Sequence, residues 1–217
     1  AGNILVMRFT NGGWAGLNKA TGEKVWDFAR PLGGFVGGQA LVRLPDGTET
    51  LVMKSGEIIR VSDGKVLVAK EQAAFKGSSS VLAFVAFGNT VVVPDGKATT
   101  AWRLLLEGDK VACQQVWQRA AQGGNESPII TDRHLILEPA TVVDRATGRI
   151  IGKAGATFTG PETNPSTAAG PYLIRWRGEC YSGHGNQGIR NRPHQDQLFS
   201  PAQVWKISAD GKTELVA

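Results

Sequence analysis

The chain has 217 residues, of which 41% are apolar and 20% charged, a balance typical of a globular protein and not of a disordered chain. Its formal net charge of +5 is mild and includes no run of like charges, so nothing points to a nucleic-acid-binding face. The longest apolar stretch, residues 81–87, is far shorter than the roughly 20 residues of a transmembrane helix. The 28 glycines indicate many turns and therefore many short elements.

Short strand-like segments bounded by turn residues follow one another along the whole chain. A first group contains three of them, and four later groups contain four each. In chain order the expected strands are Ile4–Phe9, Trp14–Leu17, Lys24–Phe28; Gln39–Arg43, Glu49–Met53, Glu57–Val61, Lys65–Val68; Val81–Phe87, Thr90–Val93, Thr100–Leu105, Val111–Trp117; Ser127–Ile130, His134–Leu137, Ala140–Val143, Arg149–Ile151; and Thr167–Ala169, Tyr172–Trp176, Gln203–Ile207, Thr213–Val216.

One segment, Trp102–Gln122, has an apolar pattern that also fits a helix. Gly108 and Asp109 interrupt that pattern in the middle, so two strands joined by a turn are the preferred interpretation. Because the other segments alternate like strands, the sequence predicts an all-β protein.

A strand–turn–strand unit recurs near the end of each group. Its turn glycines are Gly22, Gly64, Gly108, Gly148 and Gly211. The separations 64 − 22 = 42, 108 − 64 = 44 and 148 − 108 = 40 match the period of a four-stranded propeller blade. The last separation, 211 − 148 = 63, indicates an insertion of about 20 residues. The expected blades are 1–31 (incomplete), 32–75, 76–122, 123–160, and 161–217 with an inserted loop at 177–200.

The segment from Asn18 to Trp26 resembles the tryptophan-docking motif of pyrroloquinoline-quinone-like (PQQ-like) β-propellers, which reads Ala-x-Asp-x-x-Thr-Gly-x-x-x-Trp. Asn18 stands where the family has Asp, and Gly16 where it has Ala. The fourth repeat has Gly152 in place of the Trp. The residues assigned to the repeated motif are Thr21, Gly22, Trp26, Asp63, Gly64, Gly108, Trp117, Asp144, Thr147, Gly148, Asp210 and Gly211.

The resemblance implies that Trp26 and Trp117 pack between neighbouring blades, which suits a large flat ring. It also implies a ring of seven or eight blades. This chain would then supply part of the ring, with the remainder coming from the same polypeptide or from another chain, because a ring protects its blade edges by closing.

The family resemblance allows two kinds of function. Some members are dehydrogenases that oxidise alcohols or sugars with PQQ and Ca²⁺, and others are cofactor-free scaffolds, such as the lipoprotein subunit of the outer-membrane β-barrel assembly machine. The sequence has no adjacent pair of cysteines, no Cys-x-x-Cys-His haem site and no dense acidic cluster to nominate a Ca²⁺ site. We therefore expect a scaffold without a cofactor. A quinoprotein dehydrogenase and a carbohydrate- or peptide-binding propeller remain alternatives.

The inserted loop holds the candidate binding residues, because loops on a rigid scaffold often carry function. The candidates for contact with a protein partner are Trp176, Arg177, Arg190, Arg192 and His194. Arginine side chains there can bind carboxylate or phosphate groups through two-pronged hydrogen bonds. Cys180, His184 and His194 are weak candidates for a metal site.

Cys113 and Cys180 allow a single disulfide, but their spacing leaves open whether they pair. His134 falls within a strand pattern, which favours a structural role. The first residues lack the pattern of a secretory signal. The expected location, periplasmic or extracellular in a bacterium, comes from the family resemblance, and no nucleic-acid partner or membrane span is expected.

Overall fold

The computed structural model of the protein describes residues 2–9, 13–28, 39–76, 83–120, 127–137, 141–153, 166–175 and 203–216. Regular structure in these residues is β-strand, apart from one short 3₁₀ turn at Lys70–Gln72. The chain forms two compact units. The first contains residues 1–128 and 146–148, and the second contains residues 129–145 and 149–217. Among the described residues no helix is both long and apolar enough to cross a membrane.

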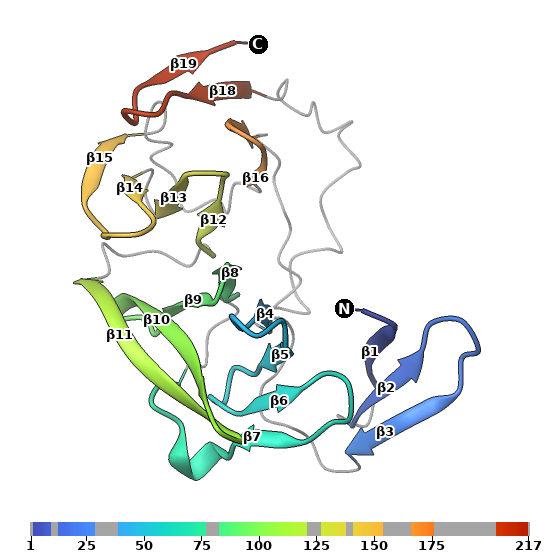
Figure 1. Cartoon of the computed structure of the whole chain (residues 1–217). Coiled ribbons are helices and arrows are strands. Elements are labelled where there is room, and N and C mark those ends of the chain that lie inside the picture. The colour runs from blue at the N-terminus through green and yellow to red at the C-terminus, as the bar shows by residue number, and fades with distance from the viewer. Residues whose placement is uncertain are drawn as a thin grey trace, which may run out of the picture. The chain divides into compact units, whose positions relative to one another are not determined.

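The first unit contains three antiparallel sheets, each made of strands that are consecutive in the sequence (Figure 1). Sheet 1 has three described strands, β1 to β3, and sheets 2 and 3 have four each. The strands are β1 (Ile4–Arg8), β2 (Trp14–Asn18), β3 (Lys24–Phe28); β4 (Ala40–Arg43), β5 (Glu49–Val52), β6 (Ile58–Arg60), β7 (Val66–Val68); and β8 (Val85–Phe87), β9 (Thr90–Pro94), β10 (Ala98–Glu107), β11 (Lys110–Ala120).

The second unit contains two further antiparallel sheets of four strands, sheets 4 and 5. Their strands are β12 (Ile129–Ile130), β13 (His134–Leu137), β14 (Thr141–Asp144), β15 (Ile150–Lys153); and β16 (Ser166–Ala169), β17 (Tyr172–Arg175), β18 (Gln203–Ile207), β19 (Thr213–Leu215). The prediction of an all-β chain built from about five blade-like antiparallel sheets is confirmed.

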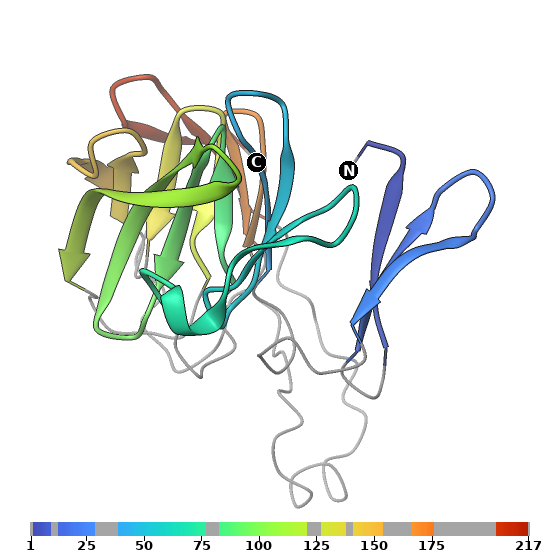
Figure 2. The ribbon, with the colours of Figure 1, turned by 60° about the horizontal axis from the view of Figure 1, so that its bottom comes forward.

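The segment around residue 108 forms a long hairpin and not a helix. Strands β10 and β11 pair antiparallel from Ala98–Ala120 to Glu107–Lys110, where a tight turn through Gly108 joins them. Gly108 has a positive φ of 61°, which glycine adopts without steric cost. The alternative of a helix at Trp102–Gln122 is therefore wrong, because the glycine that interrupts the apolar pattern forms the turn of a hairpin. Figure 2 shows how far these two strands extend.

Apolar side chains from facing sheets form the cores of the first unit. Between sheets 1 and 2 the buried residues are Trp14, Trp26, Leu51, Met53, Ile59 and Val61. Between sheets 2 and 3 a larger cluster contains Val42, Val52 and Ile58 from sheet 2 and Val91, Val93 and Leu104 from sheet 3. Sheet-on-sheet packing, and not the sheets in isolation, thus provides the hydrophobic stabilisation.

A register shift recurs at the same place in four of the five sheets. It follows Gly16 in sheet 1, Ile58 in sheet 2, Ala101 in sheet 3 and Val142 in sheet 4. Such a β-bulge adds one residue to a strand and increases its local twist. The shift places Gly16 opposite Trp26, Ile58 opposite Val68, Ala101 opposite Trp117, and Val142 opposite Gly152. In sheet 5 the register runs on without a shift, and Val216 donates its backbone N–H to the Val204 carbonyl.

Candidate functional site: the glycine turns and the side chains that dock on them

The same backbone turn joins the last two strands of sheets 1, 2 and 4. In sheet 1, Gly22 donates its N–H to the Asn18 carbonyl at 2.8 Å, and Asn18 donates to the Glu23 carbonyl at 2.8 Å. Gly64 and Arg60 repeat this pattern in sheet 2. The three turn glycines, Gly22, Gly64 and Gly148, have φ values of 75°, 73° and 70°. Glycine is required at this place because other residues rarely adopt a positive φ.

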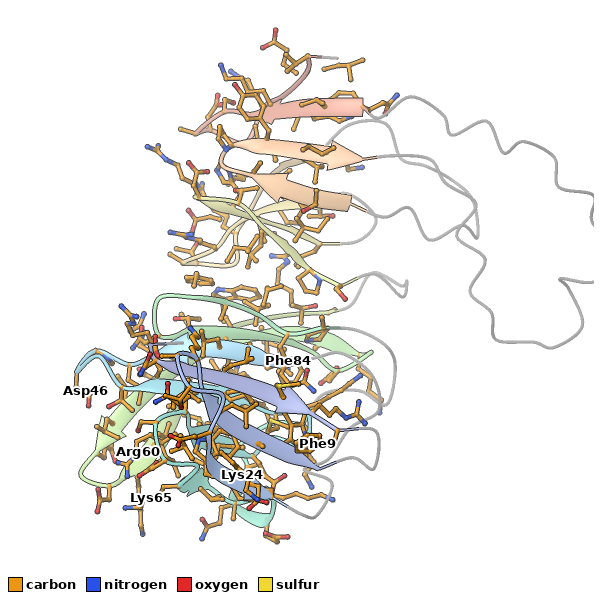
Figure 3. The ribbon with its side chains drawn as sticks, turned by 90° about the vertical axis from the view of Figure 1, so that its right-hand side faces the viewer. Phe9, Lys24, Asp46, Arg60, Lys65 and Phe84 are labelled. Carbon is orange, nitrogen blue, oxygen red and sulfur yellow. The ribbon has the colours of Figure 1, made fainter. Side chains whose placement is uncertain are left out.

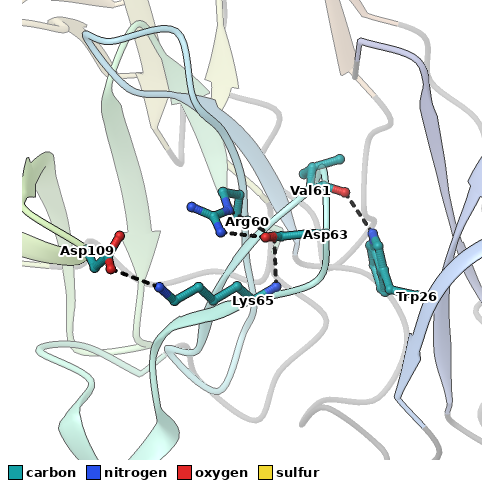
Figure 4. A network of polar contacts seen from close by, with 6 residues as sticks. All are labelled: Trp26, Arg60, Val61, Asp63, Lys65 and Asp109. Carbon is teal, nitrogen blue, oxygen red and sulfur yellow. Dashed lines mark hydrogen bonds and ion pairs between the residues drawn. The ribbon is translucent and has the colours of Figure 1, made fainter.

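The indole of Trp26, on β3 of sheet 1, lies directly on the Gly64 turn of sheet 2 (Figure 4). A Cβ atom on Gly64 would lie 2.8 Å from Cγ of Trp26, which is closer than atoms can approach. The Trp26 Nε1–H donates to the Val61 carbonyl at 2.8 Å, so the buried ring also has its polar atom satisfied. On its own sheet the ring covers Gly16, where an added Cβ would be 2.2 Å away.

Trp117 makes the corresponding contact on the Gly148 turn. A Cβ atom on Gly148 would lie 2.6 Å from Cδ2 of Trp117, and Arg119 donates from Nη1 to the Gly148 carbonyl at 2.9 Å. Trp117 follows its turn glycine, Gly108, by nine residues and not by the four that separate Gly22 from Trp26. The long β10–β11 hairpin accounts for this displacement, because the register shift still places Trp117 opposite a small residue, Ala101.

In the second unit the docking contact uses smaller residues. Gly152 occupies the position that corresponds to Trp26, and a Cβ there would be 2.3 Å from the Gly211 carbonyl oxygen. A Cβ on Gly211 would in turn be 2.7 Å from Cγ1 of Ile151. The absence of a side chain at Gly152 therefore allows the β18–β19 turn to approach closely, and Ile151 provides the apolar cover.

Polar side chains within these turns form hydrogen bonds that stabilise them. Asp63 accepts hydrogen bonds from the Arg60 guanidinium, which lowers the pKa of its carboxyl, and from the Lys65 backbone N–H at 3.1 Å. Thr21 holds the same place in its turn, since its Oγ accepts the Glu23 N–H at 3.3 Å. Thr147 is the corresponding residue of the sheet 4 turn, which begins at Asp144.

The turn between β18 and β19 is one residue shorter, because Gly211 donates its N–H to the Ser208 carbonyl. Ser208 donates its hydroxyl to Oδ1 of Asp210 at 2.5 Å, and the Lys212 ammonium lies 3.0 Å from the other carboxylate oxygen. These contacts lower the pKa of Asp210 to about 2, with the Ser208 bond as the largest cause. Hydrogen bonds to the charged form favour ionisation.

Gly108, like Gly22, differs from Gly64, Gly148 and Gly211, because no atom lies within 4 Å of the place of its Cβ in the described part of the chain. The extended hairpin is instead tied to sheet 2 through an exposed ion pair between Lys65 and Asp109, 3.2 Å apart (Figure 4). The sequence assigned Gly108 to the motif by its spacing, but its turn receives no docking side chain from the described residues.

Sequence reasoning overlooked the residues that fit around the motif. Gly16 and Gly152 were noted only as departures from the family pattern, yet both allow a close approach. Arg119 follows Trp117 by two residues, and nothing in the sequence indicated that it would bind a turn carbonyl. His134 is buried in β13, and its Nε2 lies 3.3 Å from the Ala209 carbonyl oxygen of the next sheet in that unit.

The predicted binding residues of the inserted loop, namely Trp176, Arg177, Cys180, His184, Arg190, Arg192 and His194, lie outside the described residues. In the described ranges no three His, Cys, Asp or Glu side chains come together in a group that could hold a metal ion. Cys113 is a free thiol on β11, and burial raises its pKa to about 11, which favours the protonated form at neutral pH.

Comparisons with known proteins identify the type of fold. No protein-family model and no curated protein matches the chain. Among solved structures it is similar to the β-propeller BamB from Moraxella catarrhalis, with a TM-score of 0.50 and 11% identity over 99% of this chain and 67% of that one. It is also similar to the computationally designed protein Ika8, with a TM-score of 0.56 and 15% identity over 95% of this chain and 56% of that one. At these identities the likeness concerns the fold, which is a partial β-propeller of about five blades.

Proposed function

We propose that the chain is a protein-binding propeller scaffold without catalytic activity, in the cell envelope or outside the cell of a bacterium. The proposal also assigns it to the PQQ-like group of propellers. The contact that supports this assignment is the docked Trp26, which follows a Thr-Gly turn in its own sheet and covers the turn glycine of the next.

One observation carries the binding function. Strands β17 and β18 are hydrogen-bonded neighbours, with Arg175 opposite Gln203. The whole segment 176–202 therefore leaves and re-enters a single sheet at two adjacent strand ends. Connections longer than about 12–15 residues are uncommon in compact domains, and many of them have a function. This one contains Trp176, Arg177, Arg190 and Arg192, and Trp and Arg are enriched among residues that dominate binding energy.

The partner surface that this composition favours is acidic. Arginine guanidinium groups bind carboxylates through two parallel hydrogen bonds, and the chain as a whole carries a net charge of +5. A partner that presents Asp and Glu side chains around an apolar centre would match both the arginines and Trp176.

Affinity capture from envelope extracts of the source organism tests this proposal. The bait is the chain itself, compared with Arg177→Ala/Arg190→Ala/Arg192→Ala and with a matched control, Arg43→Ala, on β4 of sheet 2. We expect one protein to be retained by the wild type and the control and to be lost from the triple variant, and the purified pair to bind in calorimetry. Equal retention by all three baits would overturn the role of the loop.

The absence of a cofactor is part of the same proposal and needs its own test. The purified chain is incubated with PQQ and Ca²⁺, and its absorbance and its dye-linked oxidation of alcohols and sugars are recorded. We expect no bound quinone and no dye reduction above that of the free cofactor. Sustained dye reduction would establish the alternative, a quinoprotein dehydrogenase.

A further inference from the structure

Strand β11 is the outer edge of sheet 3, because the strands of this sheet follow the order β11-β10-β9-β8. It has 11 residues, whereas the outer strands β3, β7, β15 and β19 of the other sheets have between 3 and 5. An edge strand presents a row of backbone N–H and C=O groups, and a long, flat edge can accept a further strand. Among the described strands, β11 therefore offers the longest backbone edge.

The hydrogen bonds of Leu104 on β10 indicate which backbone groups of β11 face outward. Leu104 donates its N–H to the Asn89 carbonyl at 2.8 Å, and its own carbonyl accepts from the Asn89 side-chain amide at 2.9 Å. Leu104 thus bonds on the side away from β11, so it forms a non-hydrogen-bonded pair with its ladder partner, Cys113. Because the pattern alternates, the backbone groups of Val111, Cys113 and Gln115 point away from the sheet.

This part of the edge is open in the described part of the chain. No backbone hydrogen bond joins its outward groups to another described residue. Edge strands are often blocked by Pro, by charges or by a bulge, but residues 110–115 contain no Pro and a single charge, at their start. The register shift, at Val116, comes only after them. Gln114 and Gln115 point to opposite faces of the sheet and are both exposed, so an added strand can be accommodated on both sides.

The side chains on one face of this edge favour an apolar neighbour. Val111 is buried in the core between sheets 2 and 3, and Cys113, two residues further along the same face, is partly buried against that core. Directly opposite residues of paired strands share a face and contact each other. An apolar residue opposite Cys113 on an added strand would therefore extend the core and be stabilised by burial.

The other face favours an acidic neighbour, because it carries the exposed Lys110. This ammonium forms no ion pair with a described residue, since the carboxylate of the adjoining turn, Asp109, is paired with Lys65, which Figure 3 labels. On β10 the same face carries Glu107 and Arg103, whose charges offset each other. Lys110 lies on the edge strand itself, so a carboxylate of an added strand would pair with it first.

We propose that the edge of β11 binds an extended segment of a partner protein as an added strand. The segment has apolar residues on the face of Cys113 and acidic residues on the face of Lys110. The outward backbone groups require the extended conformation, since a strand places its donors and acceptors at the same two-residue spacing. A second copy of β11 is a poorer match, because this strand contains no acidic residue. The surface is separate from the inserted loop, and the proposal holds whether or not that loop binds a partner.

A capped peptide of alternating Val and Glu, about eight residues long to match a typical strand, is the probe that tests the proposal. NMR titration of the isotope-labelled chain follows its binding, and hydrogen exchange reports on the amides of Val111, Cys113 and Gln115. Two further peptides carry N-methyl groups, one on its Val amides and the other on its Glu amides. The protein variants are Gln115→Pro, which removes an outward N–H, its matched control Gln115→Ala, which retains it, and Lys110→Glu.

We expect the three amides to exchange rapidly in the free chain and slowly with the peptide bound. Gln115→Pro should weaken binding at least about five-fold through the lost hydrogen bond, and Gln115→Ala should bind like the wild type. Lys110→Glu should weaken binding of this peptide and favour one of alternating Val and Lys. Because only alternate amides of a strand face its neighbour, one N-methylated peptide should bind and the other should not.

Circular dichroism checks that each variant is folded. If Gln115→Pro is unfolded, the N-methylated peptides decide, since they leave the chain unchanged. A peptide that does not bind at about 1 mM, the weak end of the affinity range, would overturn the proposal. Equal binding of the two N-methylated peptides would do the same. Slow exchange of all three amides in the free chain would show that a second copy or another segment already covers the edge, and would also overturn it.

Discussion

At the scale of the residue, a few glycines determine how closely neighbouring sheets approach. Gly64 and Gly148 each combine a positive φ with an indole at contact distance, and so have two separate reasons to lack a side chain. Gly22 has only the first of these reasons within the described part of the chain. Substituting Ala at Gly22 therefore tests only the free-energy cost of a positive φ. Substituting Ala at Gly64 tests that cost together with the cost of a clash with the neighbouring sheet.

The first prediction compares Gly64→Ala with Gly22→Ala in urea denaturation. Both variants place Ala at a positive φ, which costs about 1 kcal/mol. In Gly64→Ala the new methyl group also meets the Trp26 ring, and overpacking adds about 1–3 kcal/mol. Equal losses of stability in the two variants would contradict the docking contact.

The second prediction concerns the carboxyl of Asp210. Its pKa in the folded chain lies below the ordinary 3.8, at about 2, because Ser208 and Lys212 bind the charged form. A lowered pKa stabilises the fold above the ordinary value, so this stabilisation is lost as the pH falls from about 3.8 to about 2. Carbon NMR of the carboxyl should show a midpoint near 2, and Ser208→Ala should raise it toward 3.8. A midpoint unchanged by the substitution would show that the bond from Ser208 is not the cause.

At the scale of the element, the outer two strands of a sheet are matched in side-chain size. Gly16 lies opposite Trp26 and Ala101 opposite Trp117, so a small residue on one strand receives the ring from the other. The recurring bulge keeps this pairing in place even where the hairpin is longer, as in β10–β11.

The third prediction tests this match by a double-mutant cycle. Gly16→Ala places a methyl group where the Trp26 ring lies, and should cost about 1–3 kcal/mol in the wild-type background. In a Trp26→Ala background the same change should cost close to nothing, because the ring is gone. A cost of similar size in both backgrounds would mean that Gly16 is needed for another reason.

The fourth prediction concerns the ion pair that ties the long hairpin to sheet 2. Lys65 and Asp109 have side chains 43% and 81% exposed, and exposed ion pairs contribute about 0–1 kcal/mol. Asp109→Asn should therefore change the free energy of unfolding by less than about 1 kcal/mol, and less at high salt. A larger loss would show that the hairpin depends on this contact more than on the buried Leu104 and Val111.

At the scale of the whole molecule, the sequence predicted the strands well because glycine turns and alternation are local signals. The strands expected at Gln39–Arg43 and Glu49–Met53 appear as β4 and β5 with ends shifted by one residue. The predicted strands at Thr100–Leu105 and Val111–Trp117 were shorter than the observed β10 and β11. The sequence contains no local signal for the ends of these two strands.

The contacts between sheets could be predicted only in part. Trp26 was identified from its motif, and its target, Gly64, was identified as a turn residue, but the pairing of the two follows from a packing that no local pattern specifies. Arg119 and Gly152 act at the next sheet's turn, so their roles appear only when the sheets are assembled. The candidate binding residues in segment 176–202 remain predictions from sequence.

Nuclear Overhauser measurements on the isotope-labelled chain test most directly the claim that successive sheets dock through a side chain on a glycine turn. The account predicts cross-peaks from the indole protons of Trp26 to the Hα protons of Gly64 and from those of Trp117 to the Hα protons of Gly148, with both glycine signals displaced upfield by the rings. Cross-peaks from either indole only to residues of its own sheet, with unshifted glycine signals, would contradict it.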